Sequence, residues 1–242
     1  GVPQRFPRLK FLLVEANTLE NTGEGVFCQH LQVPPTASRG CVLRANAIRS
    51  FGGNGRCVAP GVPDACCTGD HAGSGRFGVR GGSLCAPGQA QGPALGMLSD
   101  GGAIVDNVVD GHWFIGVAAL VALGQLPTAG VTVSGNTLTA VDVGSGNGAI
   151  SITTDGPGVR DIRVTGNHVL GADDAGVLLR IHGTGGTISD VVIADNDILS
   201  SCRVERSCAS VFLDRIAPTA TFANVAIDRN TLAGGGRYGF WL

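Results

Sequence analysis

The sequence predicts an all-β solenoid, a fold in which short parallel strands wind into stacked coils. Three observations predict it. A hexapeptide pattern returns about every 30 residues, its fourth position is almost always asparagine, and a further apolar run follows most copies about ten residues later. The segments between these runs are short and rich in turn-forming residues, which leaves no room for helices.

The repeated hexapeptide reads apolar, any residue, small or polar, Asn, any residue, apolar. Two consecutive copies state it most clearly: VTGNHV at 164–169 and IADNDI at 193–198. The other copies are VEANTL, LRANAI, VRGGSL, IVDNVV, VSGNTL and IDRNTL, which begin at residues 14, 43, 79, 104, 133 and 227. The fourth position is Asn in seven copies and Gly82 in the remaining one. These copies predict about eight coils.

The residue types of the hexapeptide predict its backbone. Apolar residues in alternation indicate a strand. Asn and Gly adopt a left-handed backbone more readily than other residues, so the fourth position is expected to form a bend between two short strands. Coils stack about 4.8 Å apart, which places like residues above one another. The asparagines should then form a ladder in which each carboxamide bonds to backbone or to the next Asn. This interpretation gives them a structural role.

A third strand completes most coils. It is expected at GVFCQHL, GVAALVAL, GAISITT, GVLLRIH, SVFLDRI and YGFWL, which begin at residues 25, 116, 148, 176, 210 and 238. Side chains alternate across a strand. In the fourth of these runs Val177, Leu179 and Ile181 should therefore face the core, and Leu178, Arg180 and His182 should face outward.

The pattern resembles the right-handed parallel β-helix proteins of the pectate-lyase-like superfamily, over essentially the whole chain. The resemblance implies one β-helix domain spanning 1–242. It does not select an activity, because that fold hosts lyases, hydrolases, epimerases and adhesins. Asp173-Asp174 resembles one motif of the polygalacturonase-like hydrolases, but Asn136-Thr137 is followed by Leu138 and no Gly-His-Gly occurs. No specific catalytic family is matched.

The charge and the length of the apolar runs limit the kinds of binding partner to be expected. The net charge of −2 gives no reason to expect nucleic acid or an anionic membrane as a partner, and no apolar run is long enough to cross a bilayer. The chain begins just before a repeat and shows no capping segment at either end, so we expect it to be part of a longer chain. A Cys-, Gly- and Pro-rich excursion is predicted at 57–78.

The eight cysteines indicate disulfides and an oxidising, extracellular or cell-surface location. Cys202 and Cys208 should close one loop. Cys57 should pair with either Cys66 or Cys67 within the excursion. Partners for the remaining cysteines stay open, and buried free thiols in a cytosolic solenoid are the alternative. The spacing shows no zinc motif. The cysteines are Cys28, Cys41, Cys57, Cys66, Cys67, Cys85, Cys202 and Cys208.

One polar cluster combines carboxylates, an arginine and a histidine. Arg180 and Asp214 should lie side by side on adjacent coils, with Asp173 and Asp174 on the preceding turn and His182 at the strand end. Paired carboxylates serve glycoside hydrolysis. A basic side chain with Ca²⁺, the candidate cofactor, serves β-elimination. The alternative is a structural Arg180–Asp214 ion pair beside a solvated acidic turn.

Three further residues are candidates for substrate binding. Asp155 is expected near His182. Trp113 carries a ring that can stack on a sugar, although packing against a neighbouring turn is its alternative role. His71 lies in the Cys-rich excursion, a natural place for specificity, although a disulfide-pinned lid without chemistry is an equal alternative.

Two functional hypotheses follow. The first is a secreted or cell-surface carbohydrate-active protein that binds an acidic polysaccharide on its strand face, with cleavage by a lyase or hydrolase, or epimerisation, left open. The second is a non-enzymatic surface or adhesion solenoid. The low aromatic content of 5% favours the second, because sugar clefts commonly use aromatic platforms.

Overall fold

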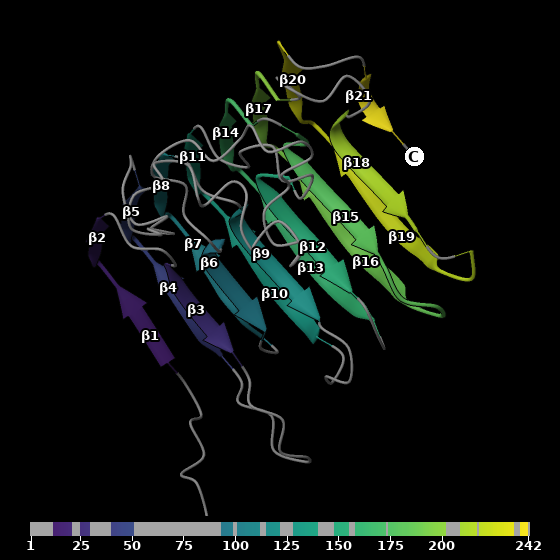
Figure 1. The fold of residues 1–242 in the computed structure, drawn as a ribbon, viewed down its shortest axis with the longest axis horizontal. Helices are drawn as coiled ribbons and strands as arrows, with labels where there is room; N and C mark the ends of the chain where they lie inside the picture. Colours follow the sequence, from purple (N-terminus) through teal and green to yellow (C-terminus); the bar gives the residue numbers. More distant parts are fainter. Residues whose placement is uncertain are drawn as a thin grey trace, which may run out of the picture.

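The fold was obtained as a computed structural model, which describes residues 12–20, 25–29, 40–50, 93–98, 101–111, 115–121, 128–139, 148–154, 158–172, 174–201, 209–216, 218–234 and 238–241. Over these residues it is a right-handed parallel β-solenoid of three seven-stranded sheets (Figure 1). One strand from each sheet makes up one coil, here termed a rung, and the described strands form seven rungs. The predicted fold class is confirmed.

Sheet A contains the strand before each asparagine and sheet B the strand after it. Sheet A consists of β1 (Leu12–Glu15), β4 (Cys41–Arg44), β7 (Ala103–Val105), β10 (Thr128–Ser134), β13 (Val159–Thr165), β16 (Thr187–Ala194) and β19 (Thr221–Asp228). Sheet B consists of β2 (Thr18–Glu20), β5 (Ala47–Ser50), β8 (Val108–Gly111), β11 (Thr137–Thr139), β14 (His168–Leu170), β17 (Asp197–Leu199) and β20 (Thr231–Ala233).

Sheet C holds the third strand of each rung. It consists of β3 (Val26–Gln29), β6 (Pro93–Leu98), β9 (Ile115–Val121), β12 (Ile150–Thr154), β15 (Val177–Ile181), β18 (Ala209–Arg215) and β21 (Tyr238–Trp241). Six of these strands fall in the predicted apolar runs. The seventh, β6, was not predicted, because PALGML has no alternation of apolar and polar residues to mark it as a strand.

The asparagine ladder is confirmed. The backbone N–H of Asn136 and its Nδ2 both donate to Oδ1 of Asn167, at 3.0 and 2.9 Å. Nδ2 of Asn136 also donates to the carbonyl of Ile104 at 2.9 Å. The same bonds recur from rung to rung between Asn17, Asn46, Asn107, Asn136, Asn167, Asn196 and Asn230. The carboxamides therefore satisfy backbone groups that a tight bend leaves without partners.

The bend itself lies one residue earlier than predicted. The left-handed residue in each rung is the one before the asparagine, for example Ala45 with φ 52° and Gly166 with φ 63°. The asparagine is instead the residue whose side chain turns into the stack. Its role is hydrogen bonding, and the conformational demand falls on a position that varies among Ala, Asp, Gly and Arg.

The predicted eighth rung does not lie in the ladder. The backbone N–H of Asn46 donates directly to Oδ1 of Asn107 at 2.9 Å, and β4 and β5 pair with β7 and β8. The hexapeptide around Gly82 has no place between them and lies outside the described residues, as does the excursion predicted at 57–78.

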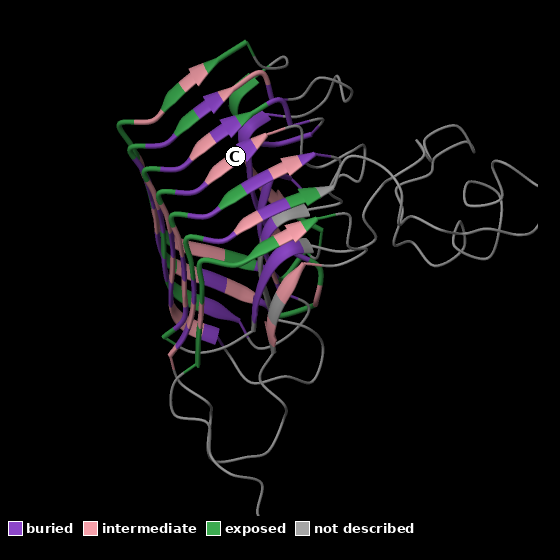
Figure 2. Ribbon diagram, turned by 90° about the vertical axis from the view of Figure 1, so that its left-hand side faces the viewer, coloured by how far each residue is buried: buried purple, intermediate pink, exposed green. Residues whose placement is uncertain are grey.

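The core runs along the solenoid axis and consists of aliphatic columns. Residues such as Val133, Val164 and Ile193 stack in register in sheet A, and all three are fully buried. Figure 2 shows buried positions repeating along the stacked rungs. Like side chains above like bury the apolar face of each strand continuously from one rung to the next.

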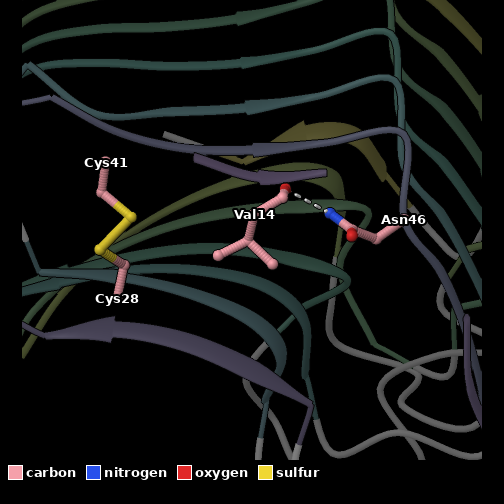
Figure 3. The surroundings of a disulfide bond; sticks show 4 residues. All are labelled: Val14, Cys28, Cys41 and Asn46. Atoms are coloured by element: carbon pink, nitrogen blue, oxygen red, sulfur yellow. Dashed lines mark hydrogen bonds between the residues drawn. A yellow bond between two sulfur atoms is a disulfide. The ribbon is translucent and has the colours of Figure 1, made fainter. Parts of the chain in front are cut away.

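A disulfide joins Cys28 in β3 to Cys41 in β4, with a Cα–Cα distance of 6.5 Å. Figure 3 shows it near the backbone of Val14, whose carbonyl accepts a 3.0 Å hydrogen bond from Nδ2 of Asn46. The disulfide links the first described rung to the second. The other predicted disulfide partners lie outside the described residues.

Candidate functional site

The outer face of sheet C carries the predicted polar cluster. As expected, Val177, Leu179 and Ile181 belong to the core. Arg180 lies between the last two of these and faces the other side of the strand. Arg180 is paired across the sheet with Asp214 of β18, which confirms that the two residues lie side by side on adjacent rungs.

The two side chains form an ion pair. Nε of Arg180 donates to Oδ2 of Asp214 at 2.7 Å, and the side chains are 17% and 24% exposed. A charge-assisted bond of this kind holds both groups in place. The arrangement agrees with the structural alternative, and a guanidinium bonded to a carboxylate is a poor proton acceptor.

The other members of the cluster are distributed differently. Asp174 is buried, with 4% of its surface exposed. His182 is exposed and its backbone N–H donates to the carbonyl of Thr154 at 2.9 Å. Four predicted site residues lie outside the described part of the chain: Asp173, Asp155, Trp113 and His71.

The outer face is covered at its centre. Leu178 is 1% exposed although it is not part of the axial core, and its neighbour in β12, Ser151, is fully buried. Among the described residues the Ser151 hydroxyl has no hydrogen-bond partner. Toward β18 and β21 the described outward residues are accessible, since Phe212 and Asp214 are half-buried and Trp241 is exposed.

An aromatic cluster occupies that accessible part. Trp241 of β21 lies beside Phe212 of β18, with ring centroids 5.3 Å apart. Tyr238 meets the same indole edge-on at 5.0 Å. Trp241 and Tyr238 are each 38% exposed. Phe212 stands two residues before Asp214 on the same face, so the aromatic cluster adjoins the ion pair.

The sequence contained the signal for this cluster. Aligning ASVFL with YGFWL as neighbouring strands puts Phe212 beside Trp241, which is the register observed. Identifying YGFWL as the third strand of its coil does not by itself reveal the cluster. An aromatic content of 5% argues against a sugar platform only on average, because the position of the rings matters more than their abundance.

The resolved electrostatic shifts lie away from this face, at exposed positions of sheet A and of the bends that follow its strands. The hydrogen bond from Arg229 lowers the pKa of Asp195, and the same bond raises the pKa of the guanidinium. Hydrogen bonds from Asn224 and Ser189 lower the pKa of Asp190. These groups link neighbouring rungs and are solvent-exposed, so their interactions are local supports for the stack.

Three further findings concern metal binding, membrane spans and similarity to known proteins. Within the described ranges no group of three or more His, Cys, Asp or Glu side chains is placed to hold a metal ion. The described part of the chain contains no helix long and apolar enough to span a membrane. Comparisons with protein-family models, with curated proteins and with solved structures found no match to this chain.

Proposed function

We propose that the protein is a carbohydrate-binding solenoid that holds a polysaccharide on the outer face of sheet C, at β18 and β21. One observation carries the proposal. An exposed indole is fixed between two aromatic rings directly beside a paired arginine and aspartate. Aromatic faces bind the apolar faces of sugar rings, and the adjoining polar pair can hydrogen-bond their hydroxyls.

The proposed ligand is an acidic polysaccharide. Arg180 forms an ion pair with Asp214 on this face. Its guanidinium favours an anionic ligand, because guanidinium bonds carboxylates with matched geometry. The eight cysteines and the Cys28–Cys41 disulfide support a secreted or cell-surface setting.

The second candidate function is the non-enzymatic surface or adhesion solenoid. The Arg180–Asp214 bond favours it, because both groups of the predicted catalytic pair satisfy one another. Binding without turnover agrees with both the aromatic platform and the ion pair.

Affinity electrophoresis against a panel of acidic and neutral polysaccharides, with and without Ca²⁺, tests the proposal. Trp241→Ala is expected to weaken binding about tenfold, the scale of one lost stacking contact. Phe240→Ala is the matched control, since Phe240 lies in the same strand but aligns with the core residue Val211. Equal losses in both variants, or no retention on any ligand by the folded protein, would contradict the proposal.

Product analysis of the same mixtures separates binding from catalysis. Reducing ends report hydrolysis, and the ultraviolet absorbance of unsaturated uronates reports elimination. Products that disappear in Arg180→Ala and Asp214→Ala would establish an enzyme. Retention without products would establish the binding protein.

A further inference from the structure

We propose that Asp214 is a competing carboxylate, which occupies on Arg180 the position that a carboxylate of the acidic ligand would take. Asp214 thereby sets how strongly, and how selectively, the outer face of sheet C binds anionic sugars. This inference rests on the proposed function and adds a specificity-determining residue to that site.

The fold holds the two side chains against one another. β15 and β18 are hydrogen-bonded neighbours in sheet C (Figure 1), and Arg180 and Asp214 are register partners in them. Leu179 and Ile181 flank Arg180 and belong to the buried core, and Leu213 packs against that core. Because side chains alternate across a strand, these inward neighbours fix the arginine and the aspartate on the outer face.

The bond between the two side chains uses the chemistry that would bind the ligand. Nε of Arg180 donates to Oδ2 of Asp214 at 2.7 Å. The acidic group of a uronate sugar is also a carboxylate, and guanidinium groups bond carboxylates in a preferred, matched geometry. A ligand carboxylate must therefore displace Asp214 from this N–H group or share the guanidinium with it.

Both displacement and sharing weaken the binding of an anionic ligand. Displacement breaks a charge-assisted hydrogen bond, which is stronger than a bond between neutral groups. Sharing places the ligand carboxylate beside a second negative charge, and like charges repel more strongly where solvent screens them less. Asp214 therefore lowers the affinity for anionic sugars and has no comparable effect on a neutral sugar held by the aromatic rings.

Partial burial makes this effect larger than it would be at an ordinary surface pair. The side chains of Arg180 and Asp214 are 17% and 24% exposed. The side chains of Arg229 and Asp195, which also join adjacent rungs, are 64% and 52% exposed. Exposed ion pairs are screened by water and salt and contribute little. The charge of Asp214 is thus screened less than that of Asp195, and it lies on the face that holds the proposed ligand.

Removing the charge of Asp214 alone tests the proposal. Asp214→Asn removes the negative charge and keeps the size of the side chain and one of its oxygen acceptors. Asp195→Asn is the matched control, because it removes the same charge from an inter-rung pair that follows β16 of sheet A. Both variants change the net charge equally, so a general electrostatic effect would move both. Calorimetry measures the binding of a polyuronate and of a neutral glucan to the unmodified protein and to each variant.

The expected result is a selective gain in affinity. Asp214→Asn should bind the polyuronate about fivefold more tightly than the unmodified protein, the scale at which one ion pair contributes. Its affinity for the neutral glucan should stay unchanged, and Asp195→Asn should match the unmodified protein on both polysaccharides. Rising salt should reduce the gain, because screening weakens the repulsion between like charges.

Three outcomes would overturn the proposal: an unchanged or weaker affinity of Asp214→Asn for the polyuronate, an equal gain on the neutral glucan, or an equal gain in Asp195→Asn. Urea unfolding establishes that each variant is folded, and Asp214→Ser replaces Asp214→Asn if the latter is not.

Trp241→Ala separates this proposal from the proposed function. Weaker binding in Trp241→Ala without a gain in Asp214→Asn rejects the competing carboxylate and keeps the carbohydrate site. Absence of binding to either polysaccharide, in the folded unmodified protein and in Asp214→Asn alike, rejects both.

Discussion

Removing one carboxamide from the middle of the asparagine ladder should destabilise the solenoid strongly. Asn136→Ala deletes two bonds donated by Nδ2, to Ile104 O and Asn167 Oδ1, each at 2.9 Å. It also deletes two bonds accepted by Oδ1 from the backbone N–H and Nδ2 of Asn107, at 3.0 and 2.9 Å. Four bonds of about 1 kcal/mol each give a loss of about 4 kcal/mol, and the buried Asn107 N–H is left without its acceptor. Such a loss is a large share of the typical free energy of unfolding of a domain, roughly 5–15 kcal/mol.

Urea unfolding followed by far-UV circular dichroism measures this change. Asn17→Ala is the matched control, because Asn17 lies in the same ladder but at its exposed end and donates two Nδ2 bonds. It should cost about 1 kcal/mol, since solvent replaces bonds at an exposed site. Equal costs for the two substitutions would refute the view that burial makes the ladder essential.

Three further predictions concern backbone, disulfide and pH. Gly166→Ala should cost about 1 kcal/mol, because Gly166 has φ 63° and, apart from its chain neighbours, no atom of the described residues lies within 4 Å of an added Cβ, so the cost is conformational alone. Replacing Cys28 and Cys41 together by Ser should cost about 3 kcal/mol, the loop-closure value for a separation of 13 residues, in urea unfolding. The folded pKa of Asp195 is lowered by Arg229, so its contribution to stability is present above the usual Asp pKa of about 3.9 and is lost as the pH falls below that value. Asp195→Asn should therefore flatten the acid limb of a stability–pH curve.

Each of these predictions has an outcome that contradicts it. Ala45→Gly is the reverse of Gly166→Ala, because Ala45 has φ 52°, and it should raise the urea midpoint; a fall in both variants would refute the backbone argument. An unchanged free energy of unfolding in the variant with both Cys28 and Cys41 replaced by Ser would show that the disulfide does not stabilise the fold. An acid limb of the same steepness in Asp195→Asn would show that other carboxylates cause the loss.

The three-strand coil and the ladder could be predicted because their signals recur. A single Asn says little, but seven at one position of a repeated hexapeptide define a column. The bend was misplaced by one residue because left-handed propensity was assigned to Asn, whereas Ala45 and Arg229 adopt that conformation without the usual residue type. The ladder bonds hold them there, which no local propensity reveals.

The remaining differences between the predicted and the observed structure depend on which strands are neighbours and in which register they pair. The hexapeptide around Gly82 matches the pattern but has no place in the ladder between Asn46 and Asn107, because pattern alone cannot tell which strands are neighbours. The adjacency of Arg180 and Asp214 was predictable, since two clear apolar runs fix their register. The aromatic cluster at Trp241 was not predicted, because it depends on the register of a short final strand and on which part of sheet C is covered.

Fluorescence of Trp241 tests the central claim most directly. In a Trp113→Phe variant Trp241 is the sole tryptophan, so its emission reports on the outer face of sheet C alone. Titration with oligosaccharides from the polysaccharide that binds best should give a saturable change in emission at the same concentrations as binding measured by calorimetry. Calorimetric binding without any change in Trp241 emission would place the ligand elsewhere and contradict the proposed site.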